Sequence, residues 1–229
     1  MIGLTLAATT FVLIHLLISG TRLRDIITGR IGVGPYMGLF SLASLGVIIW
    51  MSMAYGGART DAANLVFWGA APAAKIVQLG LTLAAFLLIV PGLLTPNPTS
   101  VRQEGALDRP DAVKGMLRIT RHPFLWGVAL WAVGHLLVNG DLASFVLFGA
   151  MLALAVLGTT SIDAKRKRAL GEKWDAFAAQ TSNAPFGAIL AGRQKLNIGE
   201  IGWRLIVGIM VWAAVLATHR MAFGVSPLP

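Results

Sequence analysis

Six long apolar runs divide the 229-residue sequence, and they constrain its fold more than any other feature. Each run reaches or approaches the length of about 20 residues that a helix needs to cross the hydrocarbon core of a bilayer. The runs are Ile2–Gly20, Pro35–Tyr55, Ala73–Leu94, Phe124–Asn139, Leu142–Thr160 and Ile201–Phe223. The sequence therefore predicts an all-α polytopic integral membrane protein with about six transmembrane helices, in a single domain that spans residues 1–229.

Composition supports a lipid environment. Hydrophobic residues make up 56% of the chain and charged residues 13%, which leaves too little polar surface for a water-soluble globule. The net charge of +9 lies in short gaps between apolar runs, a pattern that favours membrane orientation over nucleic-acid binding. The absence of cysteine excludes disulfides, thiolate ligation of haem and cysteine-held iron–sulfur clusters. We expect the lipid bilayer as partner and no nucleic acid; protein partners cannot be inferred.

Basic residues are distributed unevenly between the gaps. The gaps after the first, third and fifth runs hold 15 of the 19 Lys and Arg residues, whereas the gaps after the second and fourth hold only Arg59. Basic loops stay in the cytoplasm. The count predicts cytoplasmic odd-numbered gaps and both termini on the opposite, periplasmic side.

Two local patterns refine the fold. Gly140-Asp141 leaves almost no loop between the fourth and fifth runs, so we expect a tight antiparallel hairpin there. Leu170, Trp174 and Phe177 recur at helical spacing beside the basic run 165–168, which predicts an amphipathic helix on the cytoplasmic leaflet. A lid over a cytoplasmic cofactor site is the alternative for this helix.

Histidines are the polar groups most worth examining, because a polar side chain inside an apolar span is costly and usually faces a partner. The chain has four: His15 in the first run, His122 and His135 at the ends of the fourth, and His219 near the end of the sixth. A membrane histidine can simply bond a neighbouring helix. Two neutral imidazoles on facing helices, however, suit a haem iron.

Depth separates two ligand pairs. His135 lies 13 residues after His122, or about 20 Å along the helix at 1.5 Å per residue, whereas His15 lies nearer the cytoplasmic end of its helix. His15 and His135 are therefore offset unless a helix tilts. His135 and His219 match better in depth, and both pairs stay open at this point.

Several motifs resemble those of the NnrU family. The segment from Arg118 to Gly127, with its Arg121-His122-Pro123 centre, is followed by Gly134-His135 and ends at Asp141. Matching pieces occur along nearly the whole chain; they are Phe11–His15, Pro96–Thr99, Asp163–Arg166, Gly171–Trp174 and Pro185-Phe186.

This resemblance implies a function. The family takes its name from bacterial genes linked to denitrification and includes plant 15-cis-zeta-carotene isomerases, which hold haem b between two histidines. Carried over, the ligands are His15 and His135, with Arg121 and His122 pairing with the haem propionates. It implies a haem-b protein of the bacterial inner membrane. If the protein is an enzyme, we expect an isomerase or redox enzyme for a lipophilic small molecule; a non-catalytic assembly or haem-handling role is the alternative.

A second resemblance leads elsewhere. Arg121-His122-Pro123 together with Gly171, Trp174 and Phe177 is similar to membrane methyltransferases of the isoprenylcysteine carboxyl type, which bind S-adenosylmethionine at the cytoplasmic face. The chain departs from that pattern at Leu125-Trp126, near the usual tyrosine, and at Asp163, where glutamate is common. In that reading Arg121 and His122 would hold S-adenosylmethionine instead of haem.

The distribution of basic residues gives a topology that can be tested. Reporter fusions after Asn97 and after Arg166 should report cytoplasmic loops, and a fusion at the C-terminus should report the periplasm, because basic gaps resist translocation. A cytoplasmic C-terminus would contradict the six-helix topology.

Overall fold

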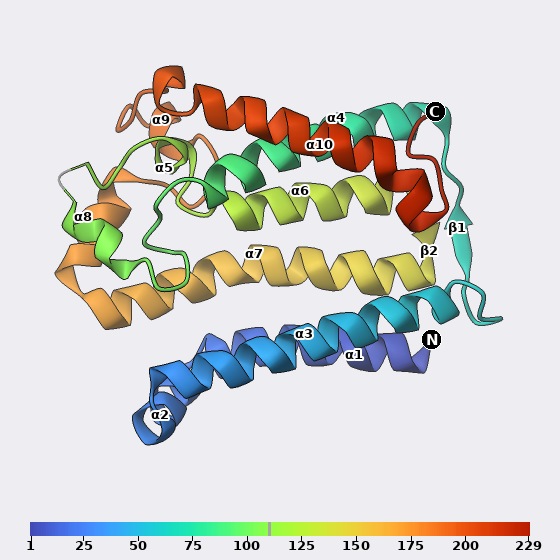
Figure 1. Ribbon diagram of the computed structural model, residues 1–229, viewed down its shortest axis with the longest axis horizontal. Helices are drawn as coiled ribbons and strands as arrows, with labels where there is room; N and C mark the ends of the chain where they lie inside the picture. The colour runs from blue at the N-terminus through green and yellow to red at the C-terminus, as the bar shows by residue number, and fades with distance from the viewer. Residues whose placement is uncertain (110) are drawn as a thin grey trace.

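A computed structural model describes residues 1–109 and 111–229, and they form an almost entirely helical bundle (Figure 1). The elements are α1 (Ile2–Leu13), the π-helix η1 (Ile14–Ser19), α2 (Arg22–Ile31), α3 (Val33–Ala58), β1 (Val66–Trp68), α4 (Pro72–Leu93), the 3₁₀ turn η2 (Glu104–Asp108), α5 (Met116–Ile119), α6 (Pro123–Val138), β2 (Gly140–Asp141), α7 (Leu142–Leu170), α8 (Glu172–Gln180), α9 (Gly187–Leu190), the 3₁₀ turn η3 (Ile198–Glu200) and α10 (Gly202–Phe223).

The predicted all-α membrane fold is confirmed. Five helical segments are long and apolar enough to cross a membrane: α1 with η1, α3, α4, α7 and α10. The fourth predicted span, α6, is apolar but only 16 residues long. Large apolar side chains such as Leu42, Met53 and Ile206 lie exposed on outer faces, as expected for a surface that lipid covers.

The long helices pack as a chain of neighbours (Figure 1). The helix α10 packs on α4, α4 on α6, α6 on α7, and α7 on α1, which also contacts α3. Thus α4 and α10 form one side of the bundle, α1 and α3 form the other, and α6 with α7 joins them. Both chain termini lie at the same end as β1 and β2.

Glycine allows α4 and α6 to approach closely. A Cβ atom added at Gly127 of α6 would lie 2.5 Å from Ile89 Cγ1 and 2.8 Å from the Ala85 carbonyl oxygen, so only glycine fits. At Gly134 the neighbours are the side chains of Leu81 and Gln78, at 3.4 and 3.6 Å. Small residues at such a seam let two backbones pack tightly without a hydrophobic driving force from water.

The predicted hairpin between α6 and α7 is present, and a short strand closes it. The backbone turns at Gly140-Asp141, which forms β2 and pairs antiparallel with β1. Asp141 caps α7 by accepting hydrogen bonds from the Ser144 N–H and hydroxyl, at 3.0 and 2.8 Å. Trp68 covers Gly140 and donates its indole N–H to the Leu137 carbonyl at 3.0 Å. The sequence analysis did not predict this strand pairing.

The amphipathic helix lies where it was predicted, as α8, but protein covers its apolar face. Trp174 and Phe177 are 2% and 3% exposed and pack with Leu117, next to Val113. That face is therefore buried against the segment before α6 instead of resting on a lipid leaflet. The helix α7 also continues ten residues beyond the predicted end at Thr160, to Leu170, and so carries Asp163 out of the apolar region.

A substitution that adds one methyl group tests how closely α4 and α6 pack. Gly127→Ala should destabilise the protein by about 1–3 kcal/mol, because the new Cβ overlaps Ile89 and the Ala85 carbonyl. Gly149→Ala in α7 is the matched control, since its Cβ meets nothing within 4 Å. Thermal unfolding in detergent measures both, and equal melting temperatures for the two variants would contradict the close seam.

Candidate functional site

A cavity of about 1060 Å³ lies inside the bundle, toward the end that carries both termini. Residues of α3, α4, α6, α7 and α10 line it, together with β1, β2 and the C-terminal residues Val225, Ser226 and Pro227. Most of its wall is apolar or aromatic, with contributions from Phe86 and Trp212. Cavities of this size and character bind small molecules and cofactors.

His135 lines this cavity, and one of its ring nitrogens is free of hydrogen-bond partners among the described residues. Its Nδ1 lies 2.8 Å from the Trp131 carbonyl oxygen, one turn earlier on α6. A carbonyl only accepts, so Nδ1 carries the proton and Nε2 keeps a lone pair. The ring is fixed between Trp131 and Phe148, at centroid distances of 4.7 and 4.9 Å. A neutral imidazole held in this way has the tautomer and the orientation of a metal ligand.

His219 is held by the same kind of contact. Its Nδ1 lies 2.9 Å from the Val225 carbonyl oxygen, and Phe223 packs beside the ring at 4.8 Å. The carbonyl again fixes the proton on Nδ1, so Nε2 keeps its lone pair. His219 lines the same cavity as His135, from α10. The structure thus brings these two histidines, which the depth argument paired, to one cavity.

His15 lies elsewhere. Its Nδ1 contacts the Phe11 carbonyl oxygen at 2.7 Å, and its Nε2 lies 3.3 Å from the Ser44 hydroxyl of α3. The ring packs against Phe11 and Phe40, and it is not part of the cavity wall. The π-helical turn η1 that holds it is an uncommon conformation, often found at functional positions. In this conformation, both ring nitrogens of His15 have protein partners.

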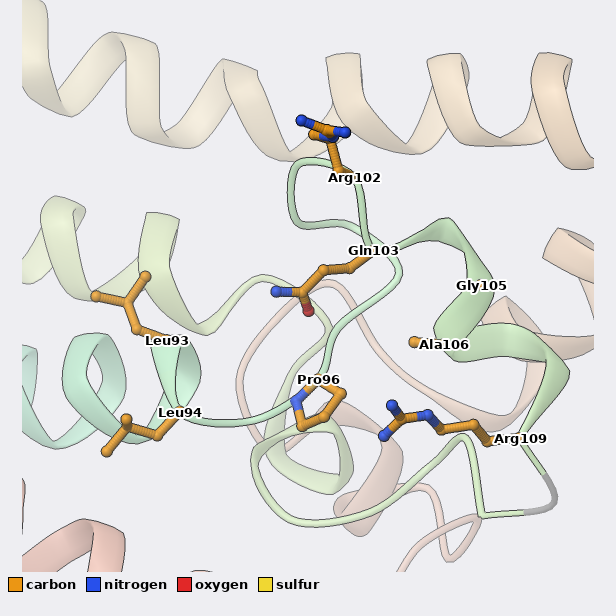
Figure 2. Close-up of a pocket in the computed structure, with 8 residues that line it drawn as sticks. All are labelled: Leu93, Leu94, Pro96, Arg102, Gln103, Gly105, Ala106 and Arg109. Carbon is orange, nitrogen blue, oxygen red and sulfur yellow. The ribbon is translucent and has the colours of Figure 1, made fainter.

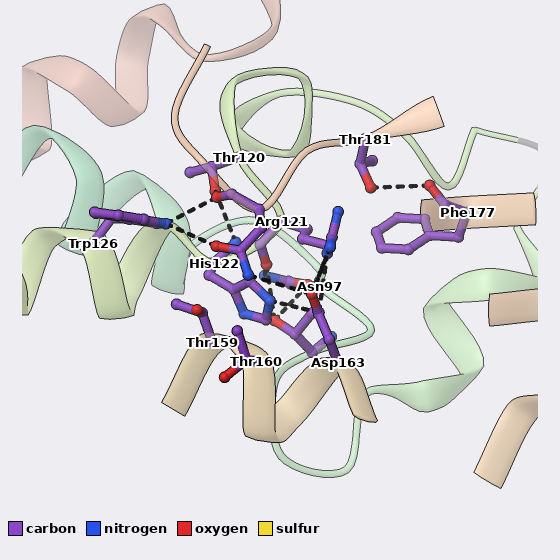
Figure 3. A network of polar contacts seen from close by, with 12 residues as sticks. Asn97, Thr120, Arg121, His122, Trp126, Thr159, Thr160, Asp163, Phe177 and Thr181 are labelled. Carbon is purple, nitrogen blue, oxygen red and sulfur yellow. Dashed lines mark hydrogen bonds and ion pairs between the residues drawn. The ribbon is translucent and has the colours of Figure 1, made fainter. Parts of the chain in front are cut away.

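Arg121 and His122 meet at Asp163 (Figure 3). The Arg121 Nε donates to both carboxylate oxygens, at 3.0 and 3.1 Å, and His122 Nε2 lies 2.7 Å from Oδ1. The Arg121 carbonyl accepts from the Asn97 amide and the Thr99 hydroxyl, at 3.0 and 2.9 Å. These contacts fasten the segment after α4 and the start of α6 to α7, and we call this network the Asp163 clamp.

Burial sets the protonation of His122. Its side chain is 1% exposed, and this burial lowers the pKa of the imidazole although the bond to Asp163 opposes the shift. His122 is therefore neutral near pH 7 and donates its Nε2 proton to the carboxylate, while its buried Nδ1 has no partner among the described residues. The Asp163 clamp lies at the opposite end of α6 from His135, and neither Arg121 nor His122 lines the cavity.

A smaller pocket of about 410 Å³ opens near the clamp (Figure 2). Its wall includes Leu93, Leu94 and Pro96, with Arg109 directed toward Pro96 across the pocket. Arg102 also belongs to the wall.

Comparisons with known proteins agree with these motifs. The model of the NnrU protein family matches residues 3–227. The chain belongs to the NnrU family. The chain is 28% identical over 190 residues to a chloroplastic 15-cis-zeta-carotene isomerase of Arabidopsis thaliana, and the match covers 81% of this chain and 50% of that protein. It is 30% identical over 106 residues to the Zea mays protein of the same name, covering 45% of this chain and 29% of that protein.

This NnrU chain spans half the length or less of the two curated relatives. No solved structure matches it.

The cavity wall also holds polar residues that the sequence motifs did not single out, among them Gln78 and Lys75, and Arg59 lies in the same wall. Gln78 is 6% exposed, and its amide makes no hydrogen bond among the described residues. The rule that selected the histidines, a polar group inside an apolar span, applies equally to Gln78 and Lys75 in the run Ala73–Leu94. Arg59 had already stood out as the basic residue of the even-numbered gaps.

The Asp163 clamp predicts a specific loss of stability. Asp163→Asn leaves a buried guanidinium without its counter-charge, and we expect a cost of about 2 kcal/mol or more, because the pair keeps only slight solvent exposure. Asp108→Asn, which removes an exposed partner of Lys173, is the control and should leave the melting temperature nearly unchanged. Equal effects of the two substitutions on thermal unfolding would contradict a structural role for the clamp.

Proposed function

We propose that this protein binds haem b in the large cavity and acts on a lipophilic polyene, as an isomerase. The observation that carries the proposal is the His135 ring: it lines a cavity of about 1060 Å³, its Nδ1 is bonded to the Trp131 carbonyl, and its Nε2 has no hydrogen-bond partner among the described residues. In this proposal His135, which the family resemblance implies, would be one of the residues that hold the haem iron. The proposal takes His219 as the second ligand, because His219 faces the same cavity and has the same tautomer.

The ligand chemistry of the cavity fits haem. A metal ion bound by protein alone needs three or four side chains, and among residues 1–109 and 111–229 no group of three or more His, Cys, Asp or Glu comes together. A porphyrin supplies four nitrogen ligands itself, so its iron needs only one or two imidazoles from the protein. The aromatic side chains of Trp131 and Phe148 offer flat apolar surfaces for a macrocycle.

When bound, haem would supply an iron centre that can exchange an electron with a substrate. The residues of the chain would bind and orient. Phe86 and Trp212 form apolar surface for a conjugated chain, and the Trp212 indole N–H is held by the Thr82 hydroxyl at 3.2 Å. The Gln78 amide would donate or accept a hydrogen bond in a wall that is mostly apolar.

The substrate class rests on the relatives. Both curated proteins are named 15-cis-zeta-carotene isomerase, and isomerisation of a polyene needs no group to be added or removed. An apolar cavity within a membrane protein suits such a substrate, because the molecule can enter from the bilayer. We also propose that the protein belongs to a bacterial inner membrane, with both termini periplasmic and a role linked to denitrification, as the family name implies.

The cofactor proposal is tested by absorption spectroscopy. Protein purified in detergent after haem-sufficient expression should show a sharp Soret band and, on reduction, the split visible bands of low-spin bis-imidazole haem. His135→Ala should abolish the spectrum or convert it to high spin, because the chain has no cysteine to replace the lost ligand. A folded, colourless wild-type protein that binds S-adenosylmethionine would overturn the haem proposal in favour of methyl transfer.

The second ligand is assigned by a pair of variants. His219→Ala should lose the low-spin spectrum, whereas His15→Ala should keep it, because His15 lies outside the cavity wall. His122→Ala should also keep it, since His122 lies about 20 Å along α6 from His135. Loss of the low-spin spectrum in His15→Ala with retention in His219→Ala would instead assign His15 and His135 as the ligands.

A further inference from the structure

Two basic side chains lie at the end of the cavity that carries the chain termini. Arg59 follows α3 directly, and Lys75 lies in the first turn of α4; both line the cavity. Arg59 is also the basic residue that stands apart from the charge distribution, because the gap that holds it is otherwise free of Lys and Arg.

The Arg59 guanidinium is available for a ligand. It lies 6.0 Å from the centroid of the Tyr55 ring, and among the described residues it makes no hydrogen bond or ion pair. Both backbone groups of Arg59, in contrast, are hydrogen-bonded. The N–H donates to the Tyr55 carbonyl, and the carbonyl accepts from the Asn64 amide at 3.1 Å. The five N–H groups of the side chain are therefore held at the cavity without a protein acceptor.

Lys75 keeps unused donor capacity. Its Nζ donates to the Leu228 carbonyl at 2.8 Å and approaches the Ser226 carbonyl at 3.5 Å. These contacts fix the ammonium beside the C-terminal residues that line the cavity. An ammonium has three N–H groups, and carbonyl oxygens do not neutralise its charge.

The acidic groups nearby do not neutralise this pair. Asp141 lines the cavity as well, but its two carboxylate oxygens accept hydrogen bonds from the Ser144 N–H and hydroxyl. Asp61, two residues after Arg59, is bonded to the N-terminal amino group of Met1 at 2.6 Å. The Asp141 carboxylate keeps its charge while it caps α7, so two cations and one anion line the cavity and their sum is positive.

We propose that Arg59 and Lys75 bind the carboxylates of the ligand in this cavity, which under the proposed function are the two haem propionates. A guanidinium fork and an ammonium both bind carboxylates through charge-assisted hydrogen bonds. This assignment rests on the haem proposal and replaces the expectation that Arg121 and His122 take the propionates. Arg121 is already paired with Asp163, and the clamp lies at the opposite end of α6 from His135.

Esterified haem separates carboxylate binding from haem binding. The full-length protein, expressed under haem limitation, is titrated in detergent with ferric haem b and with its dimethyl ester, in which both propionates are neutral. Wild-type protein should bind the free acid at least about tenfold more tightly than the ester, as charged hydrogen bonds of about 1.5 kcal/mol or more would give. The double variant Arg59→Gln, Lys75→Gln should lose this preference while still binding the ester.

Arg220→Gln is the matched control. Arg220 lies in the last turn of α10, next to His219 and at the same end of the bundle, but it does not line the cavity. Its substitution removes a positive charge nearby and should leave the preference for the free acid intact. The Soret shift on binding gives each dissociation constant, and thermal unfolding checks that each variant is folded.

The outcomes are distinct. Wild-type protein that binds free acid and ester equally, or a double variant that keeps the wild-type preference, overturns the assignment of Arg59 and Lys75 and leaves the haem proposal standing. An equal loss of preference in Arg220→Gln also overturns it, because general charge and not the two side chains would then be responsible. Wild-type protein that binds neither form overturns both proposals.

Discussion

The close approach of α4 and α6 is the contact on which the site depends. At Gly127 the α6 backbone lies so near Ala85 and Ile89 that a Cβ does not fit, and at Gly134 it lies against Gln78. Gly134 directly precedes His135, so the same seam that joins the two helices brings the Gln78 amide and the His135 ring to one wall. A bulky residue at either glycine would separate the helices and move both polar groups.

The position of the cavity follows from the order in which the helices pack. Because α10 packs on α4 while α3 packs on α1 and α7, the bundle has two sides, joined through α6 and α7. The space between these sides is closed at one end by β1, β2 and the C-terminal residues. At the other end the Asp163 clamp ties the start of α6 to α7. Polar contacts thus fix each end of the bundle, and the cavity walls between the two ends are mostly apolar.

Periodicity and apolar length were sufficient to predict the spans, because in lipid a helix satisfies its own backbone and its length is set by the bilayer. Two predicted histidines, His135 and His219, proved to share the cavity. The burial of Trp174 under protein and the pairing of β1 with β2 could not be predicted, since both depend on which segments meet in space. The rule applied to the histidines, that a polar group inside an apolar span usually faces a partner, also covers Gln78. An amide is not a usual metal ligand, so the search for ligands did not select it.

Electrostatics separates the two ends of the protein in a way that bears on function. At the clamp, Arg121 faces Asp163 across a nearly closed network, so its charge is neutralised within the fold. At the cavity, Arg59 and Lys75 have aromatic and carbonyl neighbours but no carboxylate of their own among the described residues. A ligand carboxylate would supply the counter-charge that Arg59 and Lys75 lack among the described residues. Under the proposal, the anionic groups of a ligand in the large cavity would therefore lie at the end that holds His135 and His219, and not at the end that holds the Arg-His-Pro motif.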